Sequence, residues 1–275
     1  MKNILKVSIL VFLISNTNLF AQGFQGKAYY QTKTTFDMKL DSSKVSTEQQ
    51  KMFKEMMKKR FEKVYELSFN ASESIYKEEE QLQQPGKGGM RMFGGFGSGK
   101  NYKNTKTKVY AKEQNLMGKQ FLVKDSLKVL DWKFEDESKM IGKNLCFKAT
   151  ATKEIKRNSF RFGRRNKKKT EDEKPKDSIK TIEIVAWYTV DIPVNHGPDE
   201  YWGLPGLILE VNADKTQIVC TKIVINPKEK AEIKEPTKGD VVDEKEYKKI
   251  MTKKMKEMRE MYGGGRRKGG SGRRF

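Results

Sequence analysis

The sequence has very few of the residues that build metal sites and nucleophilic active sites. It contains one histidine, His196, and two cysteines, Cys146 and Cys220, among 275 residues. A structural zinc site usually needs four nitrogen or sulfur ligands, so these three residues do not favour one. No serine or cysteine nucleophile stands beside His196, which we expect to be a surface turn residue. We therefore expect no cofactor and no catalytic residue, and we rank an enzyme below a binding protein.

Long apolar runs are also lacking, apart from one at the amino terminus. Lys2 and Lys6 begin a segment that continues with the apolar stretch 7–14 and ends with a small residue, Ala21. This arrangement is typical of a secretory signal peptide, and the stretch is shorter than the roughly 20 residues that a bilayer span requires. We expect cleavage after Ala21 and a periplasmic or secreted mature protein.

Export places the two cysteines in an oxidising compartment, in which a disulfide persists. In the chain-entropy model, a bond between residues this far apart in sequence stabilises a protein by roughly 4 kcal/mol, less any strain. Free cysteines in strands are also common. The sequence leaves both alternatives open for Cys146 and Cys220, a disulfide or two free thiols.

Acidic residues are too few to balance the charge. The chain has 57 Lys and Arg against 36 Asp and Glu, a net charge of +21, and removing Lys2 and Lys6 leaves +19. The segment 156–169 contains eight basic residues and no acidic one. Such blocks are either solvated loops or interaction segments. Because the protein is exported, we expect anionic lipid or lipopolysaccharide as the partner, and no nucleic acid. The candidate contact residues are Arg161, Arg164, Arg165, Lys167, Lys168 and Lys169.

The pattern of apolar residues predicts a mainly β protein. About nine short segments rich in β-branched and aromatic residues follow one another between residues 26 and 225, with turns between them. Consecutive strands without intervening helices favour an antiparallel sheet. Because strands twist, a sheet this wide curls, so we expect a strongly curved sheet or half-barrel with a helix covering its concave face.

A helix is predicted near each end of the mature chain. Ser46 and Gln49 form a capping-box pair at the start of the first helix, and Asp243 caps the second with Glu246 three residues on. The second helix carries four methionines on one face. Thioether sulfur suits Cu(I), whereas the alternative is that these side chains fill a core. The candidate metal ligands are Met251, Met255, Met258 and Met261.

Two segments interrupt the predicted sheet. In the first segment, 85–104, seven of the first seventeen residues are glycine. The second segment, 156–178, carries the basic block. Both are predicted to be flexible insertions, because neither composition favours a helix or strand interior. The predicted organisation is a signal peptide (1–21), a β domain (22–230), a helical extension (231–262) and a disordered basic tail (263–275).

One hexapeptide resembles a known family signature. Gly203-Leu204-Pro205-Gly206-Leu207-Ile208 matches the name motif of the GLPGLI family of exported Bacteroidetes proteins, and the turn at 195–198 is similar to the Asn-Gly-Pro turn of its members. The resemblance implies a periplasmic or secreted β protein of unestablished role, with a sheet similar to that of LolA-type lipoprotein carriers. The two glycines and the proline themselves predict a structural turn before a strand.

Export, the curved sheet and the basic segments together predict a non-enzymatic protein of the cell envelope. We expect the sheet to bind a hydrophobic ligand or a segment of an outer-membrane partner, such as a TonB-dependent receptor, with the basic loops contacting anionic surfaces. The alternatives are a copper or other metal carrier that uses methionine and an accessory protein of a TonB-dependent transporter.

Overall fold

A computed structural model describes residues 23–35, 46–79, 99–156 and 179–263, which form twelve strands and two helices. In chain order the elements are β1 (Gly26–Thr34), α2 (Thr47–Phe61), β2 (Lys63–Phe69), β3 (Glu73–Glu78), β4 (Asn101–Asn104), β5 (Val109–Leu116), β6 (Lys119–Ser126), β7 (Lys133–Ile141), β8 (Asn144–Lys156), β9 (Ile179–Thr189), β10 (Leu207–Ala213), β11 (Thr216–Ile225), β12 (Asp240–Val242) and α4 (Glu244–Gly263).

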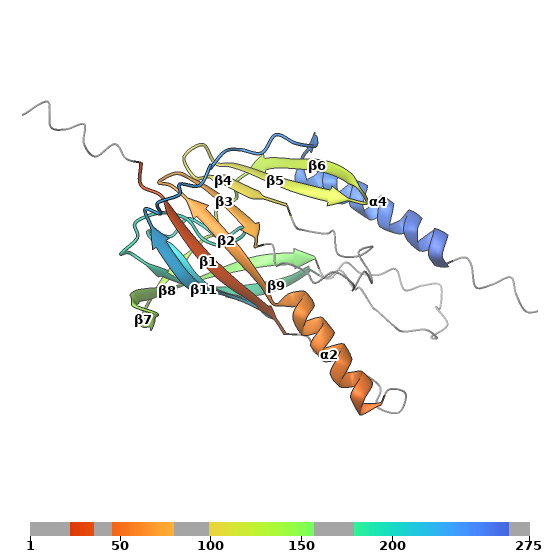
Figure 1. The fold of residues 1–275 in the computed structure, drawn as a ribbon, viewed down its shortest axis with the longest axis horizontal. Coiled ribbons are helices and arrows are strands. Elements are labelled where there is room, and N and C mark those ends of the chain that lie inside the picture. Colours follow the sequence, from red (N-terminus) through yellow and green to blue (C-terminus); the bar gives the residue numbers. More distant parts are fainter. Residues whose placement is uncertain (1–22, 36–45, 80–98, 157–178, 264–275) are drawn as a thin grey trace, which may run out of the picture.

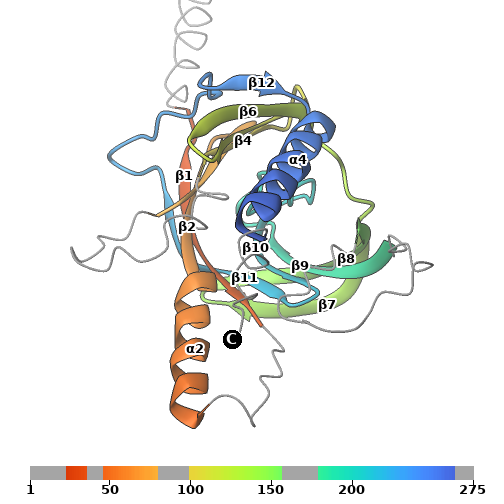
Figure 2. The ribbon, with the colours of Figure 1, turned by 90° about the vertical axis from the view of Figure 1, so that its right-hand side faces the viewer.

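All twelve strands belong to one open sheet. Their order is β12-β6-β5-β4-β3-β2-β1-β11-β10-β9-β8-β7, and every pair is antiparallel except β12 with β6. The sheet curves through most of a ring and leaves an opening between its β12–β6 side and its β8–β7 side (Figure 2). The prediction of a mainly β protein with an antiparallel, strongly curved sheet and a helix near each end is confirmed.

Two parts of the predicted organisation differ from the structure. Residues 101–104, which were assigned to a flexible insertion, form β4 in the middle of one half of the sheet. Residues 240–242, which were assigned to a helical extension, form β12 and pair with β6. Both strands are too short, at four and three residues, to show an alternating apolar pattern in the sequence.

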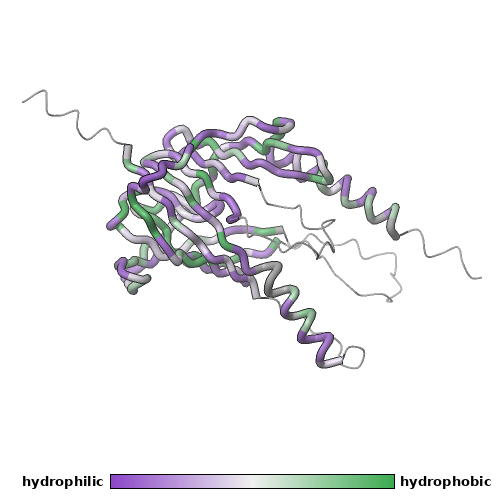
Figure 3. Tube along the Cα trace, in the orientation of Figure 1, coloured by the Kyte–Doolittle hydropathy of each residue, from purple (hydrophilic) through white to green (hydrophobic). Residues whose placement is uncertain are grey.

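The main core lies on the concave side of the sheet. In β1, Ala28 and Tyr30 are fully buried while Gln31 is exposed, as the two-residue period of a strand requires. Hydrophobic positions gather along the curved strands, whereas both helices carry many hydrophilic ones (Figure 3). Buried side chains from β1, β2, β8, β9, β10 and β11 join into one cluster that also includes residues of the connection between β9 and β10.

The two helices project from the same end of the curved sheet (Figure 1). The predicted capping box opens α2, since Ser46 and Gln49 exchange backbone-to-side-chain hydrogen bonds of 3.2 and 3.3 Å. In α4, Tyr247 is buried against Phe121 of β6, and the rest of the contact comes from its first turns. Phe121 and Val123 of β6 lie on the same face of the sheet as Lys103, so the first turns of α4 cover the concave side at β6 (Figure 2). The predicted helix over the concave face is therefore present only at this margin of the sheet. Among the described helices, none has the length and apolarity of a membrane span.

The two glycines of the hexapeptide have separate structural roles. Gly203 has a φ of +95°, in the left-handed region that side chains disfavour. Gly206 packs so closely on β9 that a Cβ atom there would lie 2.0 Å from the carbonyl oxygen of Thr189. The motif therefore holds the chain against the end of β9 just before it enters β10.

We predict that Gly206→Ala destabilises the fold by about 3 kcal/mol, because the new methyl group must displace backbone rather than a flexible side chain. Gly203→Ala should cost about 1 kcal/mol, from its left-handed backbone alone. Urea unfolding of both variants measures these losses. Gly23→Ala is the control, since a Cβ there meets no atom within 4 Å. Equal stability of Gly206→Ala and the control would contradict the close approach.

Candidate functional site

The connection between β9 and β10, residues 190–206, folds back onto the concave face of the sheet. In this β9–β10 loop, Ile192, Val194 and Leu204 are buried within the main core. The Gly203 amide donates a hydrogen bond of 3.2 Å to the carbonyl oxygen of Asn195, which closes the loop on itself. Because a buried loop must satisfy its own polar groups, such internal bonds allow it to fill the space that a helix was expected to occupy.

Lys103 on β4 reaches across the concave side to this loop. Its side chain is fully buried, and Nζ donates to the carbonyl oxygens of Gly197, Asp199 and Tyr201 at 2.6, 2.7 and 3.1 Å. Four strands separate β4 from β10 in the sheet, and neighbouring strands lie about 4.8 Å apart. This contact is therefore possible only across the inside of a strongly curved sheet.

The charge of Lys103 is set by opposing effects. Burial lowers the pKa of Lys103 to about 7, and the nearby carboxylates of Asp199 and Glu200 act in the opposite direction. Three carbonyl oxygens also match the three N–H bonds of an ammonium group, whereas a neutral amine has two. The geometry of the contact therefore favours the charged form of this lysine.

A second side chain of β4 holds the Asp199 carboxylate. The Asn101 amide donates to Asp199 Oδ1 at 2.9 Å, while Lys103 holds the backbone carbonyl of the same aspartate. The φ of Asp199 is +45°, a conformation that Asp and Asn tolerate better than most residues. Both the backbone and the carboxylate of Asp199 are thus fixed from β4.

Two tryptophans fasten the far side of the β9–β10 loop. Trp132 Nε1 donates to the carbonyl oxygen of Trp202 at 2.9 Å, and Trp202 Nε1 donates to the carbonyl oxygen of Lys128 at 2.6 Å. The segment between β6 and β7 and the loop are therefore tied together in both directions. The loop is held from β4 on one side and from this segment on the other.

His196 is part of the β9–β10 loop, and its side chain is buried. The prediction that it is an exposed residue of a surface turn is therefore wrong. Its side chain is 0% exposed, and neither ring nitrogen has a hydrogen-bond partner among the described residues. Burial and the charge of Lys103 lower the pKa of His196 to about 3. The backbone of Asn70 acts in the opposite direction, but it lies outside hydrogen-bonding geometry with the ring. The imidazole is therefore neutral, and it packs 6.2 Å from the ring of Phe69.

A cavity of about 550 Å³ opens beside the loop, at the end of the sheet from which the helices project. Its apolar lining comes from four strands and the loop, and consists of Ile155, Ile182, Ala213, Ile218 and Tyr201. Its polar lining consists of Thr34, Thr35, Asp199, Asp214, Lys215 and Thr216. We call this cavity the mouth pocket. It is apolar on the sheet side and carries polar groups from the loop and the β10–β11 turn.

Several tyrosines lie within electrostatic range of Asp199, and one of them, Tyr201, lines the mouth pocket. Tyr65 and Tyr76 are stacked, with ring centroids 4.8 Å apart and an interplanar angle of 9°. Burial raises the pKa of Tyr65 to about 12, and it also raises the pKa values of Tyr76, Tyr110 and Tyr201, each with a further contribution from Asp199. All four phenols are therefore neutral at physiological pH, and none of them adds a negative charge near Asp199.

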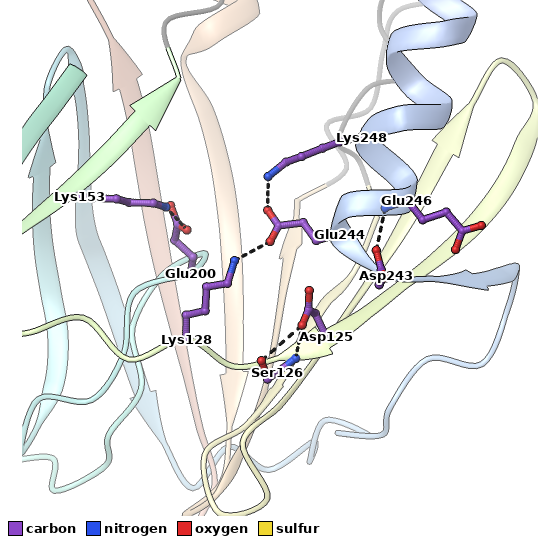
Figure 4. A network of polar contacts seen from close by, with 9 residues as sticks. All are labelled: Asp125, Ser126, Lys128, Lys153, Glu200, Asp243, Glu244, Glu246 and Lys248. Atoms are coloured by element: carbon purple, nitrogen blue, oxygen red, sulfur yellow. Dashed lines mark hydrogen bonds and ion pairs between the residues drawn. The ribbon is translucent and has the colours of Figure 1, made fainter. Parts of the chain in front are cut away.

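Ion pairs connect the β9–β10 loop and the start of α4 to neighbouring elements (Figure 4). Glu200 of the loop pairs with Lys153 of β8. Glu244, the first residue of α4, accepts from Lys128 at 2.9 Å and from Lys248 at 2.5 Å, and these two partners lower its pKa to about 2. Exposed pairs contribute little stability individually. Their consequence is positional, because they orient the loop and the start of α4.

Cys146 and Cys220 are both buried free thiols in the structure, so the disulfide alternative is not realised. The Cys146 thiol lies 3.6 Å from the carbonyl oxygen of Asn144, and the Cys220 thiol lies 3.5 Å from that of Lys222. Burial raises the pKa of Cys146 to about 11 and that of Cys220 to about 12. Neither thiol is an activated nucleophile, because the thiolate is the reactive form.

The four methionines predicted as metal ligands do not line the mouth pocket. Met251 packs against the cluster between β6 and α4, whereas Met261 is 73% exposed. Met255 and Met258 lie between them along α4 and are partly buried. The six candidate residues for anionic surfaces, between Arg161 and Lys169, lie outside the described residues, so the structure does not bear on them.

We predict that Lys103→Met lowers the free energy of unfolding by about 3 kcal/mol, because it leaves three buried carbonyl oxygens without a donor. Urea unfolding monitored by tryptophan fluorescence measures the loss. Lys106→Met is the matched control, since Lys106 is exposed two residues after the end of β4 and should change stability very little. A Lys103→Met variant as stable as this control would show that the contact contributes nothing.

We predict that the single histidine makes the fold sensitive to mild acid. An unfolded histidine has a pKa of 6.5 and the folded one about 3, so the unfolded chain binds more protons between these values. Stability is complete above pH 6.5 and falls as the pH is lowered toward 3, by about 1.5 kcal/mol between pH 6.5 and 5. His196→Leu should lose this component. Unfolding free energies of both proteins at pH 6.5 and 5 test it, and an unchanged difference between them would refute it.

Comparisons with known proteins give a family match for part of the chain. Residues 132–210, which include β7, β8, β9 and the β9–β10 loop, match a family described as a protein of unknown function (Porph_ging). No curated protein matches the chain. Two solved structures of PNGF-II are similar at 14% identity. The one in the P21 space group has a TM-score of 0.50 over 83% of this chain, and the one in the C2 space group has 0.47 over 84%.

The chain spans about a third of the length of the PNGF-II chains, since the similarity covers 33% of each. At this identity the likeness concerns the fold alone, a β-rich architecture, and the LolA-type analogy gains no support from it. The family match covers the β9–β10 loop and the hexapeptide, and that family has no known function.

Proposed function

We propose that this protein is a non-enzymatic binding protein of the cell envelope that holds an apolar ligand in the mouth pocket. The observation that carries the proposal is the cavity itself. Its volume of about 550 Å³ lies within the range of about 300–1,000 Å³ that small-molecule sites occupy. Ile155, Ile182 and Ile218 give it an aliphatic wall, and its polar groups come from the β9–β10 loop, the β10–β11 turn and the end of β1.

The rigidity of the surrounding structure supports a binding role. The pocket is lined by strands of the sheet, by the β10–β11 turn and by the β9–β10 loop, which Lys103 and Asn101 hold from β4. A site built on such elements is pre-formed, so that binding requires little ordering of the protein. The pocket therefore suits a ligand that enters from the open end of the sheet.

Two buried titratable groups beside the β9–β10 loop, Lys103 and His196, are not arranged for catalysis. Lys103 has all its N–H bonds directed to carbonyl oxygens, and His196 is completely buried. Within the described ranges, no three His, Cys, Asp or Glu side chains converge as metal ligands. General acid–base catalysis needs a group within reach of substrate, and neither Lys103 nor His196 meets that condition.

The location and surroundings of the protein are part of the same proposal. The amino-terminal segment 1–21 has the arrangement of a signal peptide, and the hexapeptide 203–208 supports a GLPGLI-type exported protein. The basic segment 156–169 directly follows β8, whose end lines the pocket. Contact of that segment with anionic lipid or lipopolysaccharide, or with an outer-membrane partner, would bring the pocket close to a source of apolar ligands.

We predict that the protein binds the neutral apolar fluorophore N-phenyl-1-naphthylamine, with an increase in its emission, and that dodecanol displaces it. Ala213→Phe should weaken binding at least about tenfold, because the ring occupies the pocket at the end of β10. Fluorescence titration of the purified protein measures both.

Val241→Phe is the matched control, since Val241 is 66% exposed on β12 and does not line the pocket. It should bind the fluorophore as the unmodified protein does. Binding that is absent, or that Ala213→Phe leaves unchanged, would overturn the proposed function.

A further inference from the structure

The mouth pocket contains one carboxylate that no cation neutralises by direct contact. Asp199 lines the pocket and forms no ion pair with any described residue; its carboxylate has the neutral amide of Asn101 as its partner, at 2.9 Å. The pocket's other carboxylate, Asp214, is paired with Lys180 at 2.5 Å, and Lys215 beside it has an interaction of its own. The unpaired charge is thus on the loop side of the pocket.

Lys103 does not supply the missing partner. It lies within electrostatic range of Asp199, but its Nζ donates to three backbone carbonyl oxygens, one of them that of Asp199 itself. An ammonium group has three N–H bonds, so none is left for the carboxylate. The Asp199 carboxylate can therefore still accept a hydrogen bond from a cationic ligand.

The carboxylate is also held in place. The positive φ of Asp199, together with the bonds from Lys103 to its backbone and from Asn101 to its side chain, fixes it before any ligand arrives. Tyr201 lines the pocket next to it, and Tyr65 and Tyr76 stack nearby. A fixed carboxylate in a pocket with an aliphatic wall is suited to an organic cation, because it can accept a charge-assisted hydrogen bond from an ammonium group.

On this basis we infer that the mouth pocket binds amphipathic cations, with an aliphatic chain against Ile155, Ile182 and Ile218 and an ammonium group at Asp199. The inference rests on the proposed function and adds the chemical class of the ligand. It is opposite to what the net charge of +21 favours, since a basic protein attracts anions at long range. A preference for cations must therefore arise locally, in the pocket.

Three ligands of equal chain length test the inference. Dodecylammonium, dodecanol and dodecanoate are each used to displace N-phenyl-1-naphthylamine from the whole protein at pH 7.5 and about 0.15 M salt, where long-range fields are screened beyond about 8 Å. All three are kept below their micelle-forming concentrations. Dodecylammonium should bind about tenfold more tightly than dodecanoate, with dodecanol between them. Tighter binding of dodecanoate would overturn the inference.

Asp199→Asn removes the charge and keeps the shape, since Asn also tolerates the left-handed backbone. The variant should bind dodecanol as before but lose the preference for dodecylammonium. Asp136→Asn changes the net charge equally at an exposed position of β7 and should keep it. A preference that survives in Asp199→Asn would refute the role of this carboxylate. If that variant does not fold, as judged by its circular dichroism, the ranking in the unmodified protein still decides the inference.

The result for dodecanol separates the two proposals. If dodecanol does not displace the fluorophore, the proposed function fails and the inference fails with it. If dodecanol binds but the three ligands show no preference for the cation, the apolar pocket stands and only the assignment of Asp199 is wrong.

Discussion

The buried ammonium group of Lys103 connects the two halves of a sheet whose edges never meet. An open sheet of twelve strands has no closing hydrogen bonds to fix its curvature, so some contact across the inside must do so. Lys103 provides it by binding three carbonyl oxygens of the β9–β10 loop, which enters from the other half of the sheet. Burying a charge is costly, and the three acceptors are what offset that cost.

The same contact explains why the middle of the concave face holds a loop instead of a helix. A helix satisfies its own backbone groups but presents no free carbonyl oxygens along its length, so it offers no site for a buried ammonium group. The β9–β10 loop has irregular backbone with carbonyl oxygens that turn toward β4. It also brings Leu204 and Ile192 into the apolar core. The loop therefore contributes to the core and to the polar contact at once, and α4 remains at the margin, packed by its first turns.

The sheet, its curvature and the two helices could be predicted from the sequence because each depends on local patterns. Alternation of apolar residues marks the longer strands, and the capping residues Ser46 and Asp243 mark the helix starts. The site could not be predicted in this way. Lys103 follows a glycine-rich stretch in a strand of four residues, and lysine in such a setting is normally exposed. Its burial depends on a loop nearly a hundred residues away, and no local pattern shows that contact.

The burial of His196 could not be predicted from the sequence for the same reason. A histidine between Asn195 and Gly197 has the sequence context of a surface turn, and the turn does exist, but it is folded inward. What decides its burial is the loop's return to the sheet at Gly206, where the absence of a side chain lets the backbone contact Thr189. Turn chemistry predicts that a chain reverses direction; it does not predict on which side of a sheet the reversal lies.

The hexapeptide thereby acquires a role in the site without lining it. Gly206 fixes the point at which the loop returns to the sheet. Trp132 and Trp202 hold one side of the loop, and Lys103 holds its middle. In this arrangement Asp199 and Tyr201 line the mouth pocket. None of the six residues 203–208 lines the cavity. The backbone that the motif shapes is therefore enough to account for its two glycines, while the two residues proposed to contact the ligand, Asp199 and Tyr201, lie a few positions before it.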